Sequence, residues 1–228
     1  GSTSLMREDL QMCLYANLSG MAIYFPLLFR MKFCFTNKTL LIAASAGALV
    51  CNLLAPYITF LPLLWAVCFI EGMAKLQGTF EHMSNIQLWI TPQRDFAVFF
   101  PVLHIVLLTS IEGSGFLAAW FGYHFTWQMM NVFIVGTMCV VMAVQIVMCR
   151  PFCPMPERLS LRGIDFGSGL LVSLLMLLVS YIFVYGDYKM WFESRELRLV
   201  AGCALILAGV VIHRLLRVSN PYVDLRIF

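Results

Sequence analysis

The sequence predicts an all-α protein that crosses a membrane as a bundle of about seven helices. Of its 228 residues, 61% are hydrophobic and 12% are charged, and its mean hydropathy is +0.86. Soluble domains carry about 25% charged residues, so a water-soluble fold of this size could not bury so much apolar surface. The apolar residues also cluster in stretches close to the roughly 20 residues that a helix needs to cross a bilayer.

Seven apolar segments follow one another along the chain. They cover residues 10–29, 39–56, 58–89, 97–120, 129–149, 166–186 and 198–216. Polar or proline-bearing breaks separate them at Arg30 to Lys38, Pro56, Thr91 to Asp95, Tyr123 to Thr126, Arg150 to Arg162 and Asp187 to Arg198. Short breaks between helices predict antiparallel neighbours in a bundle. The third segment is long enough to tilt strongly or to project beyond the bilayer.

Basic residues are distributed unevenly between alternate breaks. One set of breaks, with the adjoining segment ends, holds nine: Arg30, Lys32, Lys38, Arg94, Arg150, Arg158, Arg162, Arg214 and Arg217. The opposite set holds four: Arg7, Lys189, Arg195 and Arg198. Because loops rich in lysine and arginine stay in the cytoplasm, we expect the first set to be cytoplasmic and residue 1 to lie outside. The expected location is the plasma membrane, the inner membrane of a bacterium.

The two ends predict that the chain is a piece of a longer polypeptide. Residues 1–4 lack the charged region and cleavage site of a signal peptide. Residues 221–228 resemble the start of a further helix. The expected partners are therefore the rest of the same polypeptide and the lipid bilayer.

Composition also argues against two classes of function. The eight cysteines fall mostly inside apolar runs, and no cysteine or histidine spacing is typical of a metal site, so we expect no metal and no cofactor. The net charge is +3, but no basic run is interleaved with aromatic residues, so we expect no nucleic-acid partner.

Ionisable residues inside the apolar segments are the candidate functional residues. They are Glu71, Lys75, Glu81, His82 and Glu112. Each costs about 2.5–3.5 kcal/mol to place in hydrocarbon on insertion scales, so each should face a partner or a water-filled cavity.

At about 100° per residue, four polar residues of the third segment share one face: Glu71, Lys75, His82 and Asn85. We call them the polar stripe. Glu71 and Lys75 have the spacing of a helical ion pair, and Glu81 lies off the stripe. One interpretation is that the stripe lines a solvated path in which Glu71 or Glu112 binds and releases a proton. The other is an internal salt bridge with polar neighbours that reach the cytoplasmic interface.

Glu112 lies in a run of small residues. We expect four of them to let helices pack closely: Gly113, Gly115, Ala118 and Ala119.

Residues 118–133 resemble the glycine-pair, tryptophan-arginine and asparagine stretch that ends the fifth helix of the major facilitator superfamily. The likeness is strongest to its branch of 14-helix drug:proton antiporters. Ala118 and Ala119 stand in place of the glycines, Trp127 and Asn131 match, and Gln128 replaces the arginine. Gly115 takes the place of the usual proline of the antiporter motif. Residues 69–78 are similar to the fourth-helix motif of the family, and residues 220–228 to the segment that follows its two extra central helices.

The resemblance implies a register for the chain. Residues 1–149 would be an incomplete N-terminal half that holds helices two to six, and residues 150–165 a cytoplasmic linker. Residues 166–216 would be the two inserted central helices, and residues 217–228 the start of the next helix. In this register the positive loop at Arg30 to Lys38 lacks the glycine and aspartate of the family's loop between helices two and three.

The function that follows is secondary active transport rather than catalysis. We expect proton-coupled efflux of a small amphipathic or hydrophobic compound by alternating access, with protons and that compound as partners. One alternative is a membrane scaffold or sensor that has the same fold and does not transport. Another is an intramembrane enzyme that uses Glu81 and His82 as an acid and base, although adjacent helical residues point about 100° apart.

Overall fold

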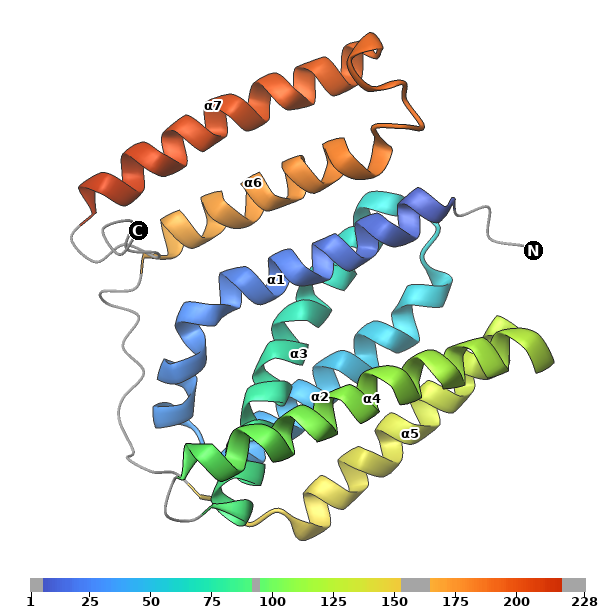
Figure 1. Cartoon of the computed structure of the whole chain (residues 1–228), viewed down its shortest axis with the longest axis vertical. Coiled ribbons are helices and arrows are strands. Elements are labelled where there is room, and N and C mark those ends of the chain that lie inside the picture. The colour runs from blue at the N-terminus through green and yellow to red at the C-terminus, as the bar shows by residue number, and fades with distance from the viewer. Residues whose placement is uncertain (1–5, 92–94, 153–164, 219–228) are drawn as a thin grey trace.

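The computed structural model describes residues 6–91, 95–152 and 165–218. These residues form seven α-helices and two single-turn 3₁₀ helices, so the predicted all-α class is confirmed (Figure 1). The helices are α1 (Arg7–Cys34), α2 (Asn37–Leu54), η1 (Ala55–Tyr57), α3 (Leu61–Ile90), α4 (Phe96–His124), α5 (Trp127–Met148), α6 (Phe166–Tyr185), η2 (Trp191–Glu193) and α7 (Arg195–Arg217). Most of the expected linker and of the expected last segment, residues 153–164 and 219–228, lies outside the described residues.

Five stretches of this bundle are long and apolar enough to cross a membrane. They are Asn37–Tyr57, Phe96–His124, Gln128–Met148, Phe166–Tyr185 and Arg195–Arg217. The helices α1 and α3, of 28 and 30 residues, are more polar, because both carry charged and amide side chains. Five apolar helices of this length support an integral membrane protein, whereas seven spans were expected from the sequence.

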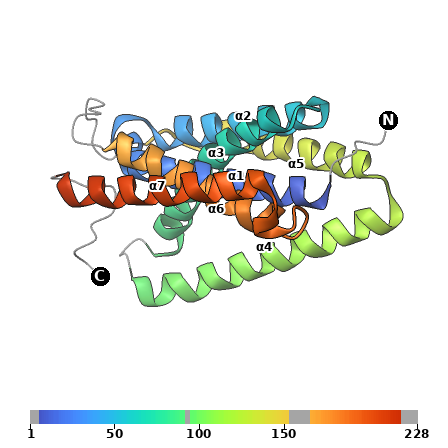
Figure 2. The ribbon, with the colours of Figure 1, turned by 90° about the horizontal axis from the view of Figure 1, so that it is seen from above.

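In space the helices follow the order α7, α6, α1, α3, α2 and α5, and α4 lies mainly against α5 (Figures 1 and 2). The two polar helices, α1 and α3, therefore lie in the middle of the row, between apolar helices. Ser173 of α6 fixes one of these contacts, because its buried hydroxyl donates to the carbonyl of Ser19 in α1 at 3.0 Å.

The backbones of α1 and α3 touch where they cross. A Cβ added to Gly72 would lie 1.9 Å from the carbonyl oxygen of Asn17, and one added to Gly20 would lie 1.9 Å from that of Phe69. The side-chain amide of Asn17 also donates to the carbonyl of Cys68 at 3.2 Å. Glycine is required on both helices, since any side chain would force them apart.

Several boundaries differ from the sequence prediction, among them the end of α1 and the start of α3. The helix α1 continues to Cys34, through the charged break expected at Arg30, because lysine and arginine are good helix formers and end only the apolar run. The expected segment 58–89 becomes α3, which follows the 3₁₀ turn Ala55–Tyr57 and begins at Leu61 with Pro62 in its first turn. Proline is favoured there because the first helical amides have no acceptor within the helix.

The start of α2 contacts the end of α5 and the residues after it, beside the first basic break. The backbone amide of Asn37 donates to the carbonyl of Phe152 at 2.9 Å, and the amide of Phe152 donates to the Asn37 side chain at 2.8 Å. The ammonium of Lys38 donates to the carbonyl of Ile146 at 2.6 Å. The start of α2 and the end of α5 are thus joined at one end of the bundle. Which side is cytoplasmic stays a prediction.

An ion pair ties the start of α6 to the end of α7. Asp165 caps α6 by accepting from the amide of Ser168 at 3.1 Å, and its carboxylate lies 3.0 Å from the guanidinium of Arg214. Burial by itself would raise the pKa of Asp165, but the hydrogen bonds from Ser168 and Arg214 outweigh it and hold the pKa below its usual 3.8. A carboxyl with a lowered pKa stabilises the fold above its unfolded pKa, and that stability is lost as the pH falls through the folded value.

Asp165→Asn should therefore destabilise the α6–α7 pair by about 0.5–1 kcal/mol at pH 7, a value reduced by solvent screening because the Arg214 side chain is 44% exposed. Asparagine caps helices as well as aspartate, so the change removes mainly the charge. Melting curves between pH 7 and pH 3 measure the effect, and the variant should lose less stability with acid than the wild type. Arg217→Gln, exposed on the last turn of α7, is the control. Equal acid sensitivity of wild type and Asp165→Asn would contradict the assignment.

A second polar contact holds α6 on α1 near the other end. The phenol of Tyr185 donates to the carboxylate of Asp9 at 2.6 Å, and both side chains are buried. Tyr185→Phe leaves that oxygen of Asp9 without its donor, at an expected cost of about 1–3 kcal/mol in unfolding free energy. Thermal melting in detergent measures the loss. Tyr188→Phe, at an exposed tyrosine, should melt like the wild type, and equal melting of the two variants would refute the contact's importance.

Candidate functional site

The polar residues of α3 bond to three neighbouring helices. The polar stripe bonds to α2 and α5, and Gln77, which bonds to Glu81, also bonds to α1. Each set has its own hydrogen-bonding partners.

Glu71 and Lys75 form the ion pair that their spacing predicts. The ammonium of Lys75 lies 2.9 Å from the Glu71 carboxylate, which also accepts from the amide of Asn52 in α2 at 2.9 Å. The Lys75 side chain is 47% exposed and that of Glu71 only 13%. The Glu71 carboxylate therefore has both a cation and a hydrogen-bond donor within the protein.

The remaining stripe residues also bond to neighbouring helices. His82 Nε2 lies 3.1 Å from the side-chain nitrogen of Gln145 in α5, and Gln145 accepts from Ser45 of α2 at 2.8 Å. Asn85 accepts from the side-chain amide of Asn37 at 3.3 Å. The contacts of the stripe in the structure are those of helix packing. Its role in proton coupling stays a prediction.

Glu81 has a different environment. The residue is 0% exposed, and its Oε1 accepts from Gln77 Nε2 at 3.2 Å. Gln77 in turn accepts from the phenol of Tyr24 in α1 at 3.0 Å, so a chain of hydrogen bonds runs from α1 to the carboxyl group. The second oxygen, Oε2, is buried and has no hydrogen-bond partner in the described part of the chain. A buried carboxylate in this state is costly, whereas a protonated acid is far less so.

Lys32 is a cation that lines the same pocket as Glu81. Its ammonium donates to the hydroxyl of Ser84 and lies 4.8 Å from the centre of the Phe80 ring. It makes no ion pair with Glu81 within 4.0 Å among the described residues. Glu81 thus has a positive charge nearby without a direct salt bridge.

A pocket of about 520 Å³ lies beside Glu81, where α1 and α3 end and α2 and α4 begin. Its lining combines charged and amide groups with aromatic rings, among them Lys32, Glu81, Ser84, Asn85, Phe96 and Phe99. We call Glu81, Gln77, Tyr24 and Lys32 the acid site. It joins a buried acid to a mixed polar and aromatic pocket, an arrangement suited to exchanging a proton in response to a bound compound.

The sequence interpretation gave Glu81 a minor role because it lies off the polar stripe. The signal that could have found the acid site is the spacing of Gln77 and Glu81, which allows a side-chain hydrogen bond along a helix. The alternative that paired Glu81 with His82 gains no contact, because Glu81 bonds toward α1 and His82 bonds to Gln145 of α5.

Glu112 and its small neighbours lie on an exposed part of α4. Glu112 is exposed, and a Cβ on Gly113 or Gly115 would have no atom within 4 Å among the described residues. Ala118 and Ala119 are exposed as well. The predicted coupling and packing roles stay predictions, and the close helix contact in the described chain is the one at Gly20 and Gly72.

The described residues contain no cluster of three or more metal-ligating side chains. Comparison of the chain with protein-family models, curated proteins and solved structures gives no match.

Proposed function

We propose that this chain is part of a secondary transporter of the major facilitator type, in the branch of 14-helix drug:proton antiporters. Its function would be efflux of a small amphipathic or hydrophobic compound in exchange for protons, by alternating access. The all-helical row with five apolar spans, together with the motif resemblance, supports this fold assignment.

One observation carries the coupling proposal. Glu81 is fully buried, and one of its carboxyl oxygens has no partner in the described chain. A carboxyl group that must be nearly neutral when buried can carry a proton, and it can release that proton when the pocket beside it hydrates or binds a cation. Glu71 is less suited to this role, because Lys75 and Asn52 already satisfy its charge.

The test is transport of ethidium, an amphipathic aromatic cation, into everted membrane vesicles that contain the complete protein. Uptake of ethidium should require a proton gradient with an acidic vesicle interior. A protonophore, which removes this gradient, should abolish the uptake. Vesicles without the protein are the control. Equal uptake in both, or uptake by the protein that the protonophore leaves unchanged, would refute proton-coupled transport of this probe.

A further inference from the structure

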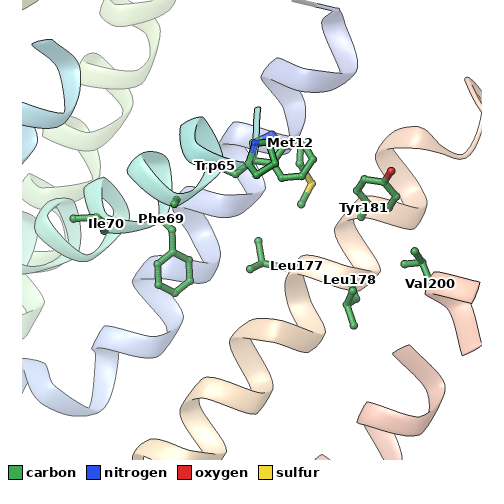
Figure 3. A pocket seen from close by; sticks show the side chains of 10 residues that line it. Met12, Trp65, Phe69, Ile70, Leu177, Leu178, Tyr181 and Val200 are labelled. Carbon is green, nitrogen blue, oxygen red and sulfur yellow. The ribbon is translucent and has the colours of Figure 1, made fainter. Parts of the chain in front are cut away.

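A second pocket, of about 610 Å³, lies where α1 and α3 meet α6 and α7. Figure 3 shows side chains from all four helices around it, among them Met12, Trp65, Phe69, Leu177, Tyr181 and Val200. The lining is made almost wholly of aliphatic and aromatic side chains. This pocket shares no lining residue with the pocket beside the acid site, so the two pockets are separate.

Trp65 holds an unsatisfied polar group at this pocket. Its indole Nε1 is buried and has no hydrogen-bond partner among the described residues. Its ring packs edge-on against Tyr181, with ring centres 6.2 Å apart, and tilted against Tyr185 at 6.4 Å. Buried indole N–H groups usually donate to an acceptor. The N–H of Trp65 lacks one, and a bound ligand could supply it.

The other polar group of the lining is already satisfied. The phenol of Tyr181 donates to Glu196 at 2.6 Å and accepts from the ammonium of Lys189 at 2.8 Å. Figure 3 shows the Met12 side chain beside the Trp65 ring. Methionine is unbranched and flexible, so it can move aside and open a path to the indole N–H.

We propose that this pocket binds a drug-sized, mainly aromatic compound with one hydrogen-bond acceptor, which accepts from Trp65 Nε1. The volume lies within the range of about 300–1,000 Å³ that encloses such ligands. A lipid acyl chain would match the apolar lining but has no acceptor along its length, so it would leave the indole unsatisfied. The inference does not depend on the transport proposal, because it concerns binding alone.

Benzophenone is a suitable probe, because it has two apolar rings, one carbonyl acceptor and its own photochemistry. Under ultraviolet light its carbonyl oxygen removes a hydrogen atom from a nearby C–H bond. The two carbon radicals then combine, which forms a C–C bond and leaves a hydroxyl on the probe carbon, with no further reagent. In native membranes that contain the complete protein, peptide mass spectrometry should find saturable adducts on Met12 and Leu177.

Ala66 also lines the pocket, so Ala66→Trp should fill it and reduce these adducts at least about ten-fold, the loss of about 1.4 kcal/mol of binding. The matched control is Ala43→Trp on the exposed side of α2, which should leave labelling unchanged. Melting curves establish that both variants are folded.

Trp65→Phe tests the acceptor. The variant keeps an aromatic ring and loses the N–H, so half-maximal labelling by benzophenone should need about five-fold more probe, the usual worth of one hydrogen bond. Diphenylmethane has the same two rings without the carbonyl, so its potency as a competitor should be equal in wild type and variant.

Three results would overturn the proposal. Adducts that are spread over exposed residues of α4, with no decrease in Ala66→Trp, would show partition into the bilayer. Absence of adducts on the pocket residues would show that another occupant, such as a lipid chain, fills it. An equal loss for benzophenone and diphenylmethane in Trp65→Phe would show that the indole contributes shape and no hydrogen bond.

Discussion

Gly72→Ala is expected to destabilise the protein by about 1–3 kcal/mol, the usual cost of overpacking, or more. The added methyl group would lie 1.9 Å from the carbonyl oxygen of Asn17 and 2.8 Å from its carbon. Both obstructing atoms are backbone, so no side chain can rotate away. Relief requires α1 and α3 to separate, which weakens the contact at the centre of the row.

Thermal unfolding of the detergent-solubilised protein measures this effect. Gly20→Ala should behave like Gly72→Ala, because its methyl group would lie 1.9 Å from the Phe69 carbonyl oxygen. Gly136→Ala is the matched control: no atom lies within 4 Å of the added carbon among the described residues, and alanine favours the helix by up to about 1 kcal/mol. If Gly72→Ala and Gly136→Ala had the same melting temperature, the close crossing of α1 and α3 would be refuted.

The positions of the apolar helices could be predicted well from the sequence. Where a helix is apolar along most of its length, the apolar run and the helix cover nearly the same residues. The expected segments 166–186 and 198–216 became Phe166–Tyr185 and Arg195–Arg217. The prediction was less exact for α1, which continues past Arg30 to Cys34. Hydropathy reports preference for a membrane, while a helix ends where its backbone geometry or capping changes.

The partners of the polar residues could not be predicted in the same way. Helical periodicity correctly placed Glu71 and Lys75 within reach of each other, and the ion pair is confirmed at 2.9 Å. It could not say that the stripe contacts α2 and α5, because one helical wheel contains no information on which helix packs against which face. Glycine positions have the same limit: small residues at 113–119 looked suited to close packing, whereas Gly20 and Gly72 make the closest backbone contact described.

Glu81→Gln is expected to reduce proton-driven ethidium uptake at least about ten-fold, which corresponds to about 1.4 kcal/mol, while the protein stays folded. Glutamine has nearly the same shape, can keep the hydrogen bond from Gln77, and cannot carry a titratable proton. The buried acid is already nearly neutral in this site, so exchange for a neutral isostere should leave the melting temperature close to that of the wild type.

The measurement that separates coupling from binding is exchange. Vesicles loaded with unlabelled ethidium should still exchange it for labelled ethidium through Glu81→Gln, because exchange needs the compound site and no net proton movement. A pH-sensitive dye inside the vesicles should report that protons leave the interior when ethidium is added to vesicles with the wild-type protein. With the Glu81→Gln variant the dye should report no such change. Loss of exchange together with uptake would assign Glu81 to binding of the compound and refute the coupling role.

Glu71→Gln and Glu112→Gln are the matched variants, because both residues were predicted from the sequence to couple protons. The structure gives Glu71 a direct cation at 2.9 Å and leaves Glu112 exposed on α4. Neither carboxyl is buried without an ion pair, as Glu81 is, so each change should alter uptake by less than about three-fold, about 0.65 kcal/mol. If either variant abolished the proton dependence and Glu81→Gln did not, the proton would be carried by the polar stripe or by α4. The hydrogen-bond chain from Tyr24 through Gln77 would then serve only to satisfy a buried acid.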